Sequence, residues 1–138
     1  LDDNFEFIKK NIPNKLDVIF IDTTHEANHV EKIIYGYYNF LKVDGYMFID
    51  DISHLPYLKN AKRNKFYCEV NNKETFERIL EIYNSNKNKF NIEFLFFSSG
   101  LAIIKKKTHE ELDPKIKIIS RENSLKNILR KLWKRVKS

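Results

Sequence analysis

The sequence contains little of what would place it in an oxidising compartment or inside a membrane. Its 138 residues include one cysteine, Cys68, so no disulfide can form within the chain. No stretch approaches the roughly 18 consecutive apolar residues of a membrane-spanning helix. The three glycines, Gly36, Gly45 and Gly100, stand far apart, so the chain has no Gly-x-Gly loop. These features favour a cytoplasmic protein kept in a reducing environment.

Acidic residues are missing from the end of the chain. Residues 124–138 hold six bases and no acid: Lys126, Arg130, Lys131, Lys134, Arg135 and Lys137. The whole chain has 25 Lys and Arg against 19 Asp and Glu, a net charge of +6, so the rest of the chain is neutral. A composition that is 42% hydrophobic and 14% aromatic predicts a globular domain with one core.

Residues 1–50 have the pattern of a strand-helix-strand unit. After a short predicted helix over residues 4–10, the apolar run LDVIFID (residues 16–22) predicts a strand buried on both faces. Asn28 and Glu31 have the spacing of a capping box at the start of the next helix. Apolar side chains then repeat at helical spacing on one face: Val30, Ile33, Ile34, Tyr37, Tyr38 and Leu41.

A turn and a second buried strand follow this helix. The segment KVDG (residues 42–45) predicts a turn in which Gly45 takes a positive φ, and YMFID (residues 46–50) predicts the strand. A crossover helix between two strands makes them parallel. Asp22 and Asp50, at the two strand ends, should therefore lie at the same edge of the sheet.

The second half of the chain predicts a helix and a hairpin. Residues 51–70 carry no motif, whereas Asn71 is placed to cap a helix that continues to about Asn84. The run NIEFLFFSSGLAIIKK (residues 91–106) predicts two strands joined by a tight turn at residues 98–100. The resulting order of elements predicts an α/β fold.

Three acids are expected at one edge of this sheet: Asp22, Asp50 and Asp51. Ligands of open parallel α/β sheets bind outside the carboxyl ends of the strands. Neighbouring strands lie about 4.8 Å apart, so carboxylates at their ends can share a divalent cation such as Mg²⁺. For any single aspartate, capping of a loop or helix remains an alternative. His25 could act as a general base here, or be an ordinary loop histidine.

The run VIFIDTTHEANHVEKIIYGYYNFLKVDGYMFIDDI (residues 18–52) resembles the second half of class I S-adenosylmethionine-dependent methyltransferases. The resemblance is to the metal-dependent O-methyltransferase group of the catechol and macrocin O-methyltransferase type. SSGLAIIKK (residues 98–106) is similar to the final hairpin of that family, and the whole resemblance covers residues 1–107. Two positions depart from the family pattern, because Thr23 and Asp44 stand where the family usually has glycine.

The resemblance implies a partial Rossmann-like methyltransferase sheet, made of the family's parallel strands four and five and its C-terminal antiparallel hairpin. It implies that Asp22, Asp50 and Asp51 bind Mg²⁺ or another divalent cation and that His25 acts as the general base. The implied reaction is methyl transfer from S-adenosylmethionine to a hydroxyl of a small molecule, with a sugar or glycan as the expected acceptor.

The family's Gly-rich loop for the methyl donor has no counterpart in this chain. The chain also begins at Leu1, so we expect it to be the C-terminal half of a longer enzyme, inactive alone, in which the strand at residues 16–22 would be a bare edge. The predicted organisation is this half-domain over residues 1–107, a linker over residues 108–123 and a basic amphipathic tail helix over residues 124–138.

The tail helix is predicted to begin at Ser124 and to carry one apolar face, which consists of Leu125, Ile128, Leu129, Leu132, Trp133 and Val136. Three partners for this face remain open. One is the chain's own domain or a second subunit in a homo-oligomer, and another is an anionic membrane surface. The third, nucleic acid, is least favoured, because no platform of aromatic and basic residues accompanies the helix.

Two other functions are compatible with parts of the sequence. Paired aspartates after a strand also hold the cation of metal-dependent nucleotide-sugar glycosyltransferases, although the closing hairpin argues against that class. A non-catalytic α/β module that assembles through its open edge and its tail is the second alternative.

Overall fold

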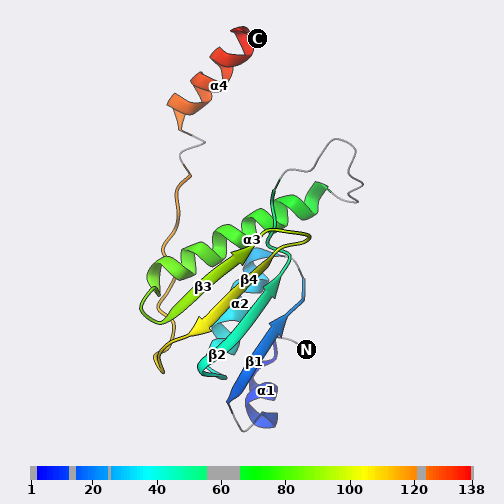
Figure 1. The fold of residues 1–138 in the computed structure, drawn as a ribbon, viewed down its shortest axis with the longest axis vertical. Coiled ribbons are helices and arrows are strands. Elements are labelled where there is room, and N and C mark those ends of the chain that lie inside the picture. The colour runs from blue at the N-terminus through cyan, green and yellow to red at the C-terminus, as the bar shows by residue number, and fades with distance from the viewer. Residues whose placement is uncertain (1–2, 13–14, 25, 56–65, 121–123, 138) are drawn as a thin grey trace.

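The computed structural model describes residues 3–12, 15–24, 26–55, 66–120 and 124–137. Their centre is a four-stranded sheet with the order β1-β2-β4-β3 (Figure 1). Its strands are β1 (Leu16–Ile21), β2 (Leu41–Asp50), β3 (Phe90–Leu95) and β4 (Leu101–Lys106). β1 and β2 are parallel, whereas β4 is antiparallel to both β2 and β3. This arrangement confirms the predicted α/β class, with two parallel strands and a C-terminal hairpin.

The described residues also form four helices: α1 (Phe5–Asn11), α2 (Ala27–Tyr38), α3 (Phe66–Ser85) and α4 (Leu125–Lys137). α2 and α3 lie side by side on one face of the sheet, and α4 stands away from it (Figure 1). α1 contacts α2 through the rings of Phe5 and Tyr37, whose centres are 5.7 Å apart.

The hydrophobic core lies between the sheet and the two packed helices. It is built from alternate residues of the strands and from one face of each helix, including Ile19, Ile21, Ile33, Ile34, Tyr38, Met47, Ile49, Ile79, Ile82 and Ile104. The hydroxyl of Tyr38 donates a hydrogen bond of 2.9 Å to the Lys89 carbonyl, so this polar atom is satisfied within the core.

The prediction that β1 is buried on both faces is wrong. Ile19 and Ile21 are buried, but Val18 and Phe20 are 57% and 60% exposed. Successive side chains of a strand point to opposite faces, and the described helices cover only one face of the sheet. Val18 and Phe20 pair in register with Tyr46 and Phe48 of β2, and these four residues form the β1 and β2 part of the open sheet face.

The predicted start of α2 also differs from the structure. Glu26 occupies the cap position, its side chain makes no capping hydrogen bond, and the helix begins at Ala27. Asn28 and Glu31 do not form a capping box, because both side chains bind Arg78 of α3. The side chains of Asn28 and Glu31, which the local sequence predicts as caps of α2, therefore bind Arg78 of another helix instead.

The turn predicted at residues 42–45 is an irregular part of β2. Asp44, not Gly45, has the positive φ, at 64°, and its carboxylate lies 2.9 Å from the Lys105 ammonium. A Cβ atom on Gly45 would lie 2.9 Å from the Asp17 carbonyl oxygen, so glycine permits the close approach of β1. α3 likewise begins before the predicted cap at Asn71, whereas the hairpin is confirmed.

Candidate functional site

The register of β1 and β2 places two of the predicted acids next to each other. Ile21 pairs with Ile49, so the residues that follow them, Asp22 and Asp50, leave the parallel strands side by side at the carboxyl edge. Asp22 is exposed and Asp50 is half-buried. This edge is the ligand-binding edge of open α/β sheets.

The carboxylate of Asp50 is held in one orientation. Its Oδ1 atom accepts hydrogen bonds from the backbone N–H of Asp51 at 2.8 Å and from the hydroxyl of Ser99 at 2.9 Å. Asp51 itself has a φ of 60°, in the left-handed region that non-glycine residues rarely occupy. A residue in this region is held there by the structure around it, and such residues are often found at functional sites.

The turn between β3 and β4 supports the loop that follows Asp50. The backbone N–H of Ser53 donates to the Ser99 carbonyl at 2.7 Å. Gly100 has a φ of +86°, and a Cβ atom there would lie 2.4 Å from the Ser53 nitrogen. Sequence reasoning recognised Ser98, Ser99 and Gly100 only as a turn and missed their support of the acidic loop.

Three buried polar atoms of the described residues, one just after this loop and two in α3, have no hydrogen-bond partner. The Nδ1 atom of His54, the Oδ1 atom of Asn72 and the Oγ1 atom of Thr75 are buried without a hydrogen-bond partner in the described structure. The Asn72 amide donates to the Ser53 carbonyl at 3.0 Å, and the ring of His54 packs 4.8 Å from that of Phe76. Buried polar atoms are normally paired, so these three can receive a water molecule or a polar ligand group.

The predicted general base, His25, lies outside the described residues. Beside it in the sequence, the Oγ1 atom of Thr23 lies 3.2 Å from Nε2 of His29, in the first turn of α2. The loop after β1 is therefore connected to the start of α2, close in sequence to Asp22.

The described residues contain no group of three or more His, Cys, Asp and Glu side chains gathered where they could hold a metal ion. The three acids predicted from the sequence thus do not form such a cluster in the described part. The donor chemistry at the strand ends still fits Mg²⁺, which prefers oxygen ligands and often uses only one or two carboxylates together with waters. Asp22 and Asp50 provide such a pair.

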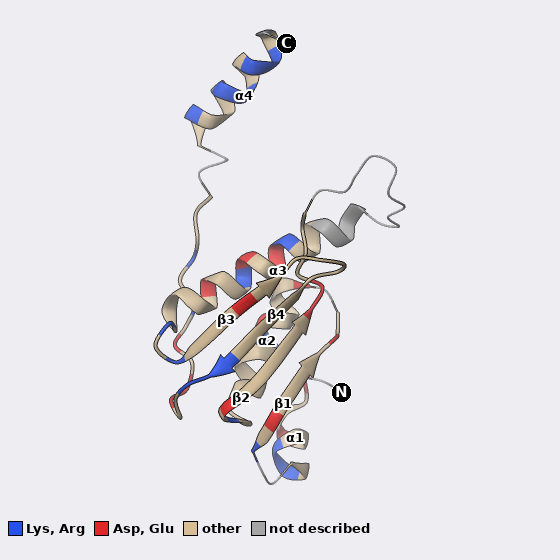
Figure 2. Cartoon of the chain, in the orientation of Figure 1, with Lys and Arg blue, Asp and Glu red and all other residues tan. Residues whose placement is uncertain are grey.

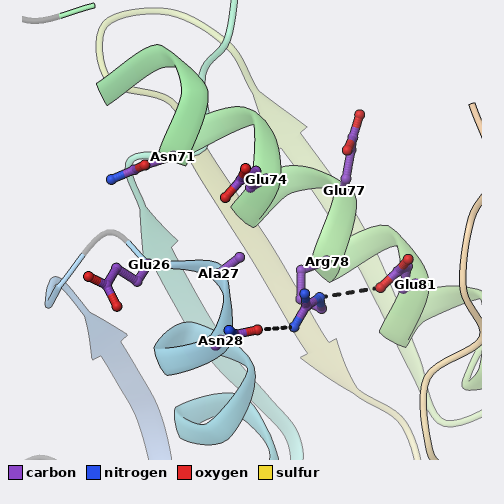
Figure 3. Close-up of a pocket in the computed structure, with 8 residues that line it drawn as sticks. All are labelled: Glu26, Ala27, Asn28, Asn71, Glu74, Glu77, Arg78 and Glu81. Carbon is purple, nitrogen blue, oxygen red and sulfur yellow. Dashed lines mark hydrogen bonds and ion pairs between the residues drawn. The ribbon is translucent and has the colours of Figure 1, made fainter. Parts of the chain in front are cut away.

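A groove of about 570 Å³ opens between the start of α2 and α3 (Figure 3). It is lined by Glu26, Ala27, Asn28, Asn71, Glu74, Glu77, Arg78 and Glu81. Arg78 lies across the groove and donates to Asn28 at 2.8 Å, and it pairs with Glu81 at 3.3 Å. At the end of the groove beyond Arg78, Glu26 and Glu74 lie on opposite sides (Figure 3).

Glu31 is the centre of a charge network that joins α2 to α3 and to the segment after β4. Burial opposes its ionisation, but hydrogen bonds from Lys115 and Arg78 outweigh this effect and lower the pKa of Glu31. The carboxylate therefore remains charged, and both cations are fixed around it. This network therefore links Arg78, which lines the groove, to Glu31 of α2 and to Glu81 of α3.

No family model matches the sequence, and no curated protein matches it. Solved structures do share its fold. A Staphylococcus aureus protein assigned as a caffeoyl-CoA O-methyltransferase superposes with a TM-score of 0.51 and 19% identity. PaMTH1, a methyltransferase of Podospora anserina solved with bound SAH, gives 0.53 and 17%. The chain has part of the fold of these methyltransferases.

A third structure of this fold is the methyltransferase MycE of the mycinamycin biosynthetic pathway, solved with Mg and SAH, with a TM-score of 0.52 and 14% identity. The three superpositions cover 74%, 78% and 80% of this chain. They cover only 47%, 47% and 31% of the other proteins, so the chain spans less than half of each.

Proposed function

We propose that this chain is the acceptor-side half of an S-adenosylmethionine-dependent O-methyltransferase that acts on a hydroxyl of a small molecule, and we name a sugar or glycan as the acceptor class. The observation that carries the proposal is the pair Asp22 and Asp50, which follow the paired residues Ile21 and Ile49 at the carboxyl edge of a sheet that shares part of the fold of methyltransferases.

Methyl transfer forms a bond between the acceptor oxygen and the methyl carbon while the bond from that carbon to the donor sulfur breaks. The sulfur leaves as a neutral thioether and needs no acid, but the acceptor hydroxyl must lose its proton. We assign this proton to His25, because a neutral imidazole with a pKa near 6.5 can accept it at physiological pH.

When bound, a divalent cation acidifies and orients a hydroxyl, and Asp22 and Asp50 would hold it together with waters. The hydrogen bonds from Ser99 and from the Asp51 backbone keep the Asp50 carboxylate in place before any ligand arrives. A carboxylate that is already oriented loses less conformational entropy on binding. The nearby unpaired atoms of His54 and Asn72 could bind other polar groups of the acceptor.

The methyl donor, in this proposal, binds to residues outside the present chain. Two observations support this assignment. The chain lacks a Gly-x-Gly loop, and the open sheet face presents Val18 and Phe20 at more than half of their full exposure. Two exposed apolar side chains on one face of β1 favour a covering partner, because burial of each stabilises the folded state by roughly 2 kcal/mol.

The metal assignment can be tested by titration calorimetry of the chain with Mg²⁺ and Mn²⁺. Asp50→Asn should weaken binding at least tenfold, because the amide keeps the hydrogen bonds from Ser99 and Asp51 but loses the negative charge. Asp17→Asn, at the other end of β1, changes the net charge equally and should bind as the wild type does. Equal affinity of wild type and Asp50→Asn would refute the metal site.

Donor binding provides the test of the reaction class. The 138-residue chain should bind S-adenosylmethionine weakly or not at all, whereas a longer protein that includes residues before Leu1 should bind it and methylate hydroxylated sugars. Micromolar binding by the isolated chain would show that the donor site has been assigned to the wrong half. A longer protein that binds no S-adenosylmethionine would refute the methyltransferase proposal itself.

A further inference from the structure

Helix α4 follows a segment that is fixed to the body of the protein. The backbone N–H groups of Ile116 and Ile118 donate to the carbonyl and the side chain of Glu81, at 3.3 and 3.0 Å. α4 begins beyond these contacts with its own cap, because Ser124 accepts a hydrogen bond of 3.4 Å from the Asn127 backbone N–H. Figure 1 shows α4 away from the sheet and from α2 and α3.

The two faces of α4 are separated sharply. At 100° per residue, its six apolar side chains fall within an arc of about 140°, and the bases occupy the remainder. The apolar side chains are 43–82% exposed: Leu125, Ile128, Leu129, Leu132, Trp133 and Val136. In the described structure this arc thus faces solvent. Exposure of a contiguous apolar surface to water is unfavourable and marks an interaction site.

The charge on α4 has one sign only. Six Lys and Arg side chains and no acid lie between residues 125 and 137, and Figure 2 shows basic residues along the helix without acidic ones. On the helical wheel, Lys126 and Lys137 border one side of the apolar arc and Arg135 borders the other. The remainder of the chain has equal numbers of acids and bases, so it offers no complementary net charge to this helix.

We propose that α4 binds in the plane of a membrane surface that contains anionic phospholipids. The apolar arc would enter the boundary between headgroups and acyl chains, and the bases at its two margins would reach the lipid phosphates. The aromatic ring of Trp133 belongs to the type of side chain that prefers this depth. None of the described helices combines the length and apolar character required to cross a bilayer, so attachment is to its surface.

The short length of α4 favours a partner that stabilises the helical conformation. Isolated helices shorter than about 12–15 residues are marginal in water, and α4 has 13 residues. Binding would therefore stabilise the helix as well as attach it. Each base near an anionic surface is expected to increase the partition coefficient roughly fivefold, and salt should reduce this effect. The proposal is independent of the methyl-transfer reaction.

The test uses the fluorescence of Trp133, which is the only tryptophan in the chain. Vesicles of phosphatidylcholine with 30% phosphatidylserine should shift its emission to shorter wavelength and should sediment the protein. Vesicles of pure phosphatidylcholine should bind at least tenfold more weakly. Raising the salt concentration should release the protein from the anionic vesicles.

A pair of matched variants separates local charge from net charge. Lys126→Glu with Arg135→Glu, one at each margin of the apolar arc, should weaken binding to anionic vesicles at least 25-fold, since two favourable bases are removed and two repelled acids replace them. Lys9→Glu with Lys10→Glu changes the net charge equally on α1, where both side chains are exposed, and should change binding less than threefold. Similar losses in both variants would refute a specific role of α4.

Other occupants of the apolar arc give different results. If a second copy or the chain's own domain covers it, the Trp133 emission will already be at short wavelength without vesicles and will not respond to them. If nucleic acid is the partner, duplex or single-stranded oligonucleotides will bind more tightly than the anionic vesicles do. Either result would overturn the proposal.

Discussion

Replacing Gly100 with alanine should damage both the stability of the fold and the loop that carries the candidate acids. Gly100 has a φ of +86°, and the added Cβ atom would meet the nitrogen, Cβ and Cα atoms of Ser53 at 2.4, 2.6 and 2.8 Å. Two of these atoms belong to the backbone, so a rotamer change cannot relieve the contact. Either the turn or the loop after Asp51 must move.

The expected cost combines three effects. An L-residue at positive φ costs about 1 kcal/mol, and overpacking of a filled site costs about 1–3 kcal/mol. Displacement of Ser53 also weakens its 2.7 Å hydrogen bond to Ser99, worth about 1 kcal/mol. Alanine has less conformational entropy than glycine in the unfolded chain, and this offsets about 0.5 kcal/mol of the lost stability. We therefore expect the free energy of unfolding to fall by about 3 kcal/mol and the Tm by about 10 °C.

Urea unfolding followed by far-ultraviolet circular dichroism is the suitable assay, because Trp133 lies in α4 and does not report on the core. Ser98→Ala is the matched control, since Ser98 has a φ of 56° in the same turn but an exposed side chain. It should change stability by less than about 0.5 kcal/mol. An unfolding midpoint of Gly100→Ala equal to that of the wild type would refute the argument that close approach requires glycine here.

Two further predictions concern ionisable groups. Burial, together with the charge of Glu110, raises the pKa of Tyr38 to about 12, so the wild type should lose stability as the pH rises from about 10 through 12. Tyr38→Phe should lose about 1 kcal/mol at pH 8 but show a smaller alkaline loss, and equal losses between pH 8 and 11 would contradict this assignment. Arg78→Ala should cost about 2 kcal/mol, because it leaves the half-buried Glu31 with one cation fewer. The lowered pKa of Glu31 contributes stability that is lost on acidification below about pH 4.3, and melting curves from pH 3 to 7 should show a smaller loss in Arg78→Ala than in the wild type.

The sequence by itself determined the elements and their order. The period of apolar residues located β1, α2 and the hairpin, because burial on one face imposes a period of 2 on strands and 3.6 on helices. The strand-helix-strand connection made β1 and β2 parallel, which predicted that Asp22 and Asp50 would leave the sheet together. The cap at Ser124 and the separated faces of α4 could likewise be predicted from the sequence, because a cap and an amphipathic arc are local patterns.

Only the tertiary structure decided which local preferences prevailed. Asn28 and Glu31 could have capped α2, but Arg78, 47 residues after Glu31, binds both. The open sheet face depends on what packs against β1, and an apolar run has the same appearance whether one face or two are covered. The fixed orientation of Asp50 depends on Ser99, 49 residues away. Such outcomes follow from contacts between distant segments, because a side chain with two favourable partners binds the one that the fold brings within reach.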